Sequence, residues 1–210
     1  MAIEHYPYIS QWADPADNRR ILAGGDPCDH PHWRQCSGFT SAQEYRFWSW
    51  RLCGVACFQS VLLRRRGLRL DAALLTRHGI WRQAMAANAF IPQPDGSVLG
   101  LIYAPFVRMI GQIYGIAATV DAAFSQEQLA GYLAAGRPVM ASVTPLVRHA
   151  RGINPDPGRN GGHLVLCYAL DRGRVWFNNP SATEAEPFHS SLPLDVFYSW
   201  CAGRGVIFCR

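Results

Sequence analysis

The sequence predicts an α+β protein in which a mainly helical first half packs on an antiparallel sheet formed by the second half. Apolar residues recur at helical spacing in residues 46–135, whereas short apolar runs between turn residues are typical of strands in residues 136–210. With 210 residues, 49% of them hydrophobic, the chain can bury one sizeable core and is neither disordered nor fibrous. We therefore expect a single domain over residues 1–210.

The first 45 residues are expected to form an extended arm or insertion. They are rich in Pro, Asp, Gly, His and aromatic residues and show no sustained period. Turns are predicted at residues 13–15 and 24–27. Thr40 or Ser41, followed by Glu44, resembles a capping box that opens a short helix through Trp48.

Helices are predicted in four places after this arm. The strongest pattern covers residues 53–66, where Val55, Phe58 and Leu62 fall three and four residues apart and Gly67 follows as a C-cap. The remaining helices are predicted at residues 71–78 with Asp71 as the cap, from about Pro105 to Tyr114, and between a Ser125 cap and a Gly136 stop. The rest of residues 80–124 is ambiguous.

The strand patterns begin after Gly136. Residues 138–143 and 163–170 are apolar runs of strand length, and a hairpin turn at residues 171–173 leads into a strand at residues 174–178. A short terminal strand is expected at residues 205–209. These strands account for the predicted antiparallel sheet.

Charge and composition exclude several classes of function. All 20 basic residues are Arg, against 15 acidic residues, and the net charge is +5. The arginines are scattered apart from Arg64–Arg66, so no nucleic-acid partner is expected. No apolar run approaches the roughly 20 residues that span a bilayer, and the N-terminus lacks a secretory pattern. We expect a cytoplasmic protein with no membrane partner, whose seven cysteines are thiols.

Cys53 is the first candidate for chemistry, because it begins the strongest helix pattern. A thiol at a helix N-terminus meets the positive end of the helix dipole, which favours the nucleophilic thiolate. Gly54 follows it and would let a substrate backbone approach closely. Without a partner, both Cys53 and Cys57 would be interpreted as small buried helix residues.

His163 is the second candidate, because the pattern Gly161-Gly162-His163 opens a buried strand. Asn179 follows sixteen residues later, after a tight hairpin that returns the chain towards His163. An Asn side chain there could orient the imidazole and fix its tautomer, as the third member of a triad does. His149 and His189 are expected at the surface, and Cys57, Cys167, Cys201 and Cys209 are expected in the core.

Together these motifs resemble a C39-like peptidase of the papain-like cysteine protease superfamily. The resemblance covers about residues 50–182 and rests on Cys53-Gly-Val-Ala-Cys57, Gly-Gly-His163 and Asn179-Pro180. It implies a papain-like fold in which Cys53 is the nucleophile and His163 the general base and acid. Asn179 stands where that family usually has Asp, so it would orient the imidazole without stabilising an imidazolium by charge.

The resemblance also implies a Gln that donates to the oxyanion. The position six residues before Cys53 is Phe47, so the close-spaced form of the motif is missing. Gln11, in the segment Tyr8-Ile-Ser-Gln-Trp12, resembles the more distant form, with residues 13–45 as an insertion. The expected substrate cleft includes Gly54, Gly162 and Trp12.

A second cluster of possible ligands lies in the arm, in Cys28-Asp-His30-Pro-His32-Trp-Arg-Gln-Cys36. Four soft ligands in nine residues could hold zinc. The spacing lacks a two-residue gap between cysteines, however, and Pro31 restricts how the two imidazoles could face one ion. A loop that shapes the cleft is favoured, and neither a metal nor a cofactor is expected.

The predicted function is hydrolysis of a peptide or amide bond through an acyl-enzyme on Cys53. Two alternatives stay open: a transamidase or acyltransferase that uses the same groups, and a catalytically silent binding module that keeps the cleft. A zinc-stabilised interaction module is a third option. The substrate and the oligomeric state are not indicated by the sequence.

Overall fold

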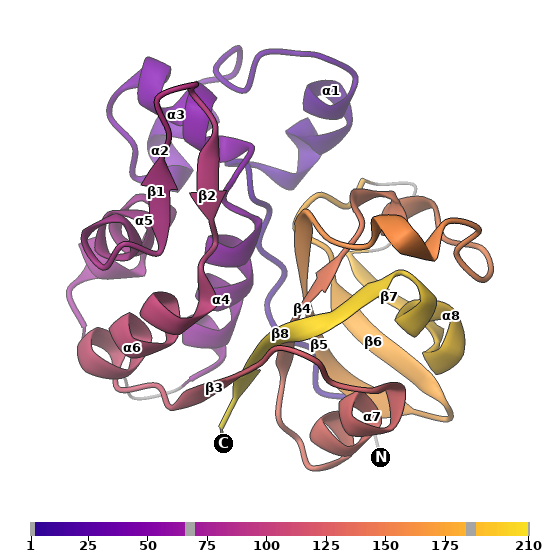
Figure 1. Ribbon diagram of the computed structural model, residues 1–210. Coiled ribbons are helices and arrows are strands. Elements are labelled where there is room, and N and C mark those ends of the chain that lie inside the picture. The colour runs from indigo at the N-terminus through magenta and orange to yellow at the C-terminus, as the bar shows by residue number, and fades with distance from the viewer. Residues whose placement is uncertain (1–2, 66–69, 184–187, 210) are drawn as a thin grey trace.

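A six-stranded antiparallel sheet lies between helices from the first half of the chain and two later helices (Figure 1). The computed structural model describes residues 3–65, 70–183 and 188–209. The strand order in the sheet is β3-β8-β4-β5-β6-β7, and β1 and β2 form a separate hairpin. The predicted α+β class is confirmed.

The helical elements lie mainly before the central strands of the sheet. They are η1 (Pro15–Asp17), α1 (Asn18–Leu22), α2 (His32–Ser37), α3 (Ala42–Ser49), α4 (Cys53–Arg64), η2 (Ala72–Leu75), α5 (Arg77–Ala86), α6 (Tyr103–Tyr114), α7 (Gln126–Ala134), η3 (Pro145–His149), η4 (Pro157–Arg159) and α8 (Leu194–Ser199). The strands are β1 (Phe90–Pro92), β2 (Val98–Gly100), β3 (Ala118–Asp121), β4 (Val139–Val143), β5 (His163–Asp171), β6 (Arg174–Asn178), β7 (His189–Pro193) and β8 (Cys201–Phe208).

Side-chain caps begin two of the predicted helices, α3 and α7. The Ser41 hydroxyl accepts from the Glu44 backbone N–H at the start of α3. Ser125 and Gln128 form a complete capping box at the start of α7. Each cap satisfies backbone N–H groups that the helix itself leaves without partners.

Two helix predictions need correction. The arm before α3 contains η1, α1 and α2, which are too short to show a sequence period. The helix predicted at residues 71–78 is a 3-10 turn, η2, capped by Asp71, and the longer helix α5 starts after it at a Thr76 cap. The C-cap predicted at Gly67 lies outside the described residues.

The central strands are buried on both faces of the sheet. Along β4 and β5, alternate residues enter two separate hydrophobic clusters. Met140, Leu164 and Leu166 pack with α4, α5 and α6, whereas Val139 and Val165 pack with α7 and α8. This explains why these strands read as continuous apolar runs in the sequence.

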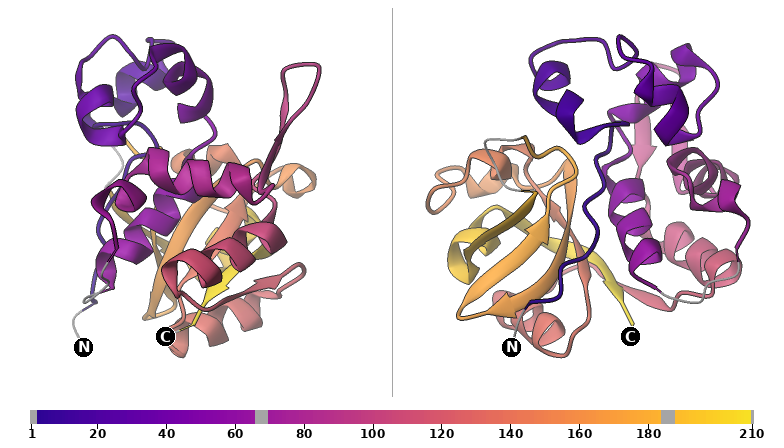
Figure 2. Two further views of the ribbon diagram at one scale, coloured as in Figure 1. Left: turned by 90° about the vertical axis from the view of Figure 1, so that its left-hand side faces the viewer. Right: turned by 180° about the vertical axis from the view of Figure 1, so that it is seen from behind.

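The N-terminal segment runs between the helical part and the sheet (Figure 2). The Pro7 carbonyl accepts a hydrogen bond from the Ser60 hydroxyl of α4 (2.6 Å) and another from the Asn178 amide of β6 (3.2 Å). The N-terminal part of the expected extended arm is therefore fixed along the boundary between the helical part and the sheet.

Two peripheral predictions also change. Cys209 is only partly buried, unlike Cys57, Cys167 and Cys201. His189 is half-buried on β7, and its Nδ1 lies 2.8 Å from the Asn178 side-chain oxygen, so it is not a free surface residue. Among the residues that the structure describes, no helix combines the length and apolar character needed to cross a membrane.

Candidate active site

Cys53 is the first residue of α4, as the sequence predicts. Its preceding residue, Leu52, makes no side-chain cap, so no capping side chain shields the helix start. The thiol is half-buried and faces a cavity of about 420 Å³. Cys53 thus lies both in the cavity lining and at the positive end of a helix.

His163 is the first residue of β5 and lines the same cavity as Cys53. Gly161 and Gly162 lead into the strand with φ values of 125° and 88°, a backbone conformation that residues with a Cβ rarely adopt. His163 is 6% exposed and pairs with Val143 of β4. The ring is thus held by a central strand of the sheet.

The β5–β6 hairpin brings Asn179 to His163. In this antiparallel ladder Leu166 lies opposite Asn178. Continuing the register by three residues along each chain places His163 opposite Ser181, so Asn179 is two residues from that position. The Asn179 Oδ1 atom lies 2.8 Å from His163 Nε2. The sequence spacing anticipated this contact.

Ser181 completes the environment of Asn179. Its backbone N–H and its hydroxyl both donate to Asn179 Oδ1, at 3.0 Å and 3.1 Å. A backbone N–H can only donate, so the receiving atom is the amide oxygen and His163 Nε2 carries the proton. The lone pair of the imidazole is therefore on Nδ1.

The cavity is lined by residues from both halves of the chain. Its lining comprises Trp50, Arg51, Cys53, Gly100, Leu101, Tyr103, Ser142, Gly162, His163, Leu164 and Arg204. A larger hollow of about 620 Å³, near Tyr6 and Tyr168, has no cysteine or histidine in its described lining. We therefore place the candidate site in the smaller cavity.

The Cys53–His163 pair is uncharged at rest, whereas the helix start favours a thiolate at Cys53. Burial raises the pKa of the Cys53 thiol, although the backbone amides of Leu164 and Gly54 act in the opposite direction. Burial lowers the pKa of His163 to about 4, against the opposing effect of its Asn179 hydrogen bond. At pH 7 the two groups are a thiol and a neutral imidazole, which suits general-base rather than ion-pair activation.

We expect the buried imidazole to weaken the fold in acid. The unfolded chain takes up a proton near pH 6.5 but the folded chain only near pH 4, so stability falls as the pH drops through this window. The His163 contribution amounts to about 3 kcal/mol between pH 7 and pH 4.

Urea denaturation of the wild type and of His163→Gln at several pH values measures how the free energy of unfolding falls between pH 7 and pH 4. The variant lacks the titrating group but can still donate to Asn179. The loss of stability in acid should be smaller in the variant by about that amount. Equal losses in the two proteins would contradict the expectation.

Gln11 lies at the junction of the two halves. Its backbone N–H donates to the Pro180 carbonyl (2.9 Å), and its side-chain amide donates to the Ser49 carbonyl (3.3 Å), just before α4. The side chain is buried, and its Oε1 has no hydrogen-bond partner among the described residues. Gln11 is thus close to both motifs but is not part of the cavity lining; its oxyanion role stays a prediction.

Two of the three expected cleft residues lie outside the cavity lining. A Cβ at Gly54 would come within 2.8 Å of the Leu101 and Leu164 side chains, so close packing rather than substrate approach explains this glycine. Trp12 is fully buried and packs edge-on against Trp50, which does line the cavity. Gly162 is in the lining, as expected.

Several residues of the site are not among those that the sequence predicts. Ser181 is predictable from the sequence, because an Asn side chain commonly accepts a hydrogen bond from the backbone N–H two residues later and so forms an Asx-turn. Tyr103, Ser142 and Arg204 enter the cavity from α6, β4 and β8. No local motif marks them, because the fold brings them in from distant parts of the chain.

No family model and no curated protein matches the sequence. The fold does match a crystal structure of a Bacillus anthracis protein described as a candidate C39-like peptidase. The TM-score is 0.52, the sequence identity is 15%, and the match covers 76% of this chain and 89% of that chain. At this identity the match shows that the two proteins share a fold.

Proposed function

We propose that the protein is a C39-like cysteine peptidase that cleaves a peptide or amide bond through an acyl-enzyme on Cys53. The observation that carries this proposal is the convergence of Cys53 and His163 on one cavity, with Nε2 of the imidazole bound to Asn179. The shared fold with the Bacillus anthracis protein supports it. Fold likeness alone does not define the chemistry, so the proposal rests on the site.

The first half of the reaction follows from the neutral pair. His163 Nδ1 removes the thiol proton as the Cys53 sulfur attacks the carbonyl carbon, forming a C–S bond and an oxyanion. The Cys53 backbone N–H, at the start of α4, would stabilise the oxyanion, and Gln11 Nε2 could do so after leaving the Ser49 carbonyl. The bond from Nε2 to Asn179 fixes the ring and leaves Nδ1 to exchange the proton with Cys53 and the leaving group.

The second half returns the enzyme to its resting state. His163 gives the proton to the leaving nitrogen, and the C–N bond breaks to leave a thioester on Cys53. Water, deprotonated by the same imidazole, then attacks the thioester carbon. The C–S bond breaks to release a carboxylic acid, and His163 returns its proton to the Cys53 sulfur. An amine in place of water would give acyl transfer by the same groups.

A peptide library digested by the purified protein tests the proposal, with new termini identified by mass spectrometry. We expect cleavage by the wild type and by Cys36→Ser, which lacks an exposed thiol on α2, and none by Cys53→Ala. Repeating the digestion with added hydroxylamine distinguishes acyl transfer, which would yield hydroxamates in place of acids. Absence of both products from the wild type would instead favour the silent binding module.

A further inference from the structure

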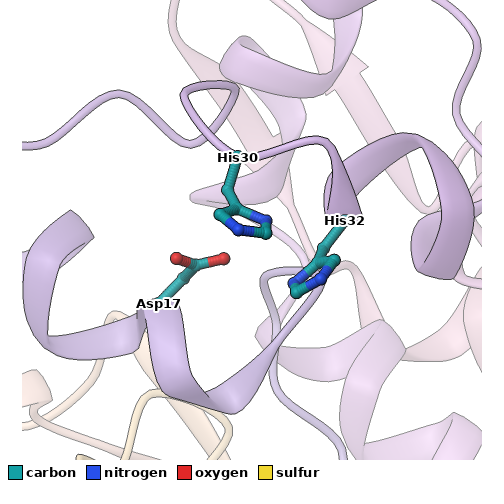
Figure 3. A group of neighbouring side chains, drawn as sticks. All are labelled: Asp17, His30 and His32. Carbon is teal, nitrogen blue, oxygen red and sulfur yellow. The ribbon is translucent and has the colours of Figure 1, made fainter.

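Three potential metal ligands meet at the surface of the arm, away from the cavity lining (Figure 3). One ligand atom each from Asp17, His30 and His32 lies within 4.8 Å of the other two. The Asp17 carboxylate faces the two imidazole rings, whose centroids are 3.8 Å apart. Asp17 and His32 are half-buried, and His30 is exposed.

The backbone around these ligands is held by Arg20 of α1. Its guanidinium donates to the Asp26 carbonyl (2.9 Å) and to the Asp29 carboxylate (2.9 Å), and its own carbonyl accepts from Gly25 N–H (3.0 Å). These bonds fix the loop that carries His30 against the helix that follows Asp17. The three ligands are thus brought together before any ion binds, which lowers the cost of ordering them.

Asp14 positions one of the two histidines. One of its carboxylate oxygens lies 3.0 Å from His32 Nδ1, and the other accepts from the Ala16 backbone N–H (2.9 Å). Metal-binding histidines commonly have one ring nitrogen bonded to a carboxylate, which fixes the tautomer and the orientation of the ring. Asp14 therefore gives His32 the carboxylate partner that metal-binding histidines commonly have.

The donor set selects the class of ion. Two imidazole nitrogens and one carboxylate oxygen suit Zn²⁺, whereas Ca²⁺ and Mg²⁺ prefer oxygen ligands alone. Three protein ligands leave a fourth position of a tetrahedral zinc site for water. An ion here would compete with Arg20 for Asp17, but that contact is long, at 3.5 Å.

We propose that Asp17, His30 and His32 bind one zinc ion, with Asp14 as a positioning residue, and that the ion ties the start of α2 and the loop before it to η1. This set differs from the four-residue set of the sequence motif. The Cys28 thiol donates to the Ala42 carbonyl (3.4 Å), and Cys36 is exposed on α2 and outside the cluster. Asp17, thirteen residues before His30, takes their place.

Calorimetric titration with zinc chloride tests the site, using untagged, chelator-treated protein. All measurements use a Cys53→Ala background, because a thiol that lines the same cavity as His163 could itself hold zinc. We expect one zinc ion per chain, binding at least tenfold weaker in Asp17→Asn and in His30→Ala. Cys28→Ser and Cys36→Ser are the matched controls and should bind as the background protein does.

Two further measurements distinguish a zinc site from a folding defect. Zinc should raise the unfolding temperature of the background protein and of both serine variants but not of Asp17→Asn or His30→Ala. Cobalt bound in place of zinc should lack the thiolate charge-transfer absorption that a cysteine ligand produces. Equal binding by the background protein and Asp17→Asn, or loss of binding in Cys28→Ser, would overturn the proposal.

Discussion

Replacing Cys53 and His163 together by alanine is expected to cost no more activity than replacing either one alone. Each single change should lower kcat/KM by a factor on the order of 10⁴ or more, because nucleophile and base act in the same step. Once the base is lost, the neutral thiol has no route to a thiolate. Once the thiol is lost, the imidazole has no proton to move.

The measurement uses the best substrate from the peptide library and compares kcat/KM for the wild type, the two single variants and the double variant. Circular dichroism and urea denaturation establish that each variant is folded. Cys36→Ser is the control for loss of a thiol elsewhere. Independent effects, with the double variant losing the product of the two single factors, would show that Cys53 and His163 do not act as one unit.

Gly205→Ala is expected to destabilise the protein by roughly 2–3 kcal/mol, the upper part of the usual range for overpacking. Gly205 lies in β8 between two partners, Asp121 of β3 and Ala141 of β4. A Cβ there would be 2.3 Å from the Met140 carbonyl oxygen. Because the new Cβ would clash with a backbone atom, no side-chain rotation relieves the clash. The strands at the centre of the sheet must therefore move apart.

Urea denaturation measures this loss, and Gly131→Ala is the matched control. Gly131 is exposed in α7, and a Cβ there meets nothing within 4 Å. We expect that substitution to stabilise the protein by about 0.5–1 kcal/mol, because alanine is the better helix former. If the two variants had equal midpoints with unchanged slopes, the crowding at Gly205 would be disproved.

Features encoded locally were predictable from the sequence. The start of α4 at Cys53, the caps at Ser41 and Ser125, and the hairpin that returns Asn179 to His163 each depend on residues close in the chain. In the hairpin, the short turn fixes the register of the two strands and therefore the position of the residues that follow the second strand.

Features that depend on distant partners were not predictable. The thiolate expected from the helix dipole fails because burial by other segments outweighs the helix start. Gly54 is explained by Leu101 and Leu164, which local reasoning could not place beside it. Asp17, in the zinc site that we propose, is not predictable for the same reason, since only the fold brings it to the motif at residues 28–36.

The N-terminal segment also sets the order in which the site can be assembled. Gln11 and Pro7 are synthesised long before their hydrogen-bond partners Pro180 and Asn178, and Pro7 and Asn178 are 171 positions apart in the chain. The pairing of these segments closes a loop of most of the chain, and such contacts form late in folding. A ribosome-bound fragment that ends before β6 therefore has Cys53 and His163 but lacks Asn179, which bonds the imidazole. The candidate site can therefore be complete only after β6 and the Asn179 that follows it have been synthesised.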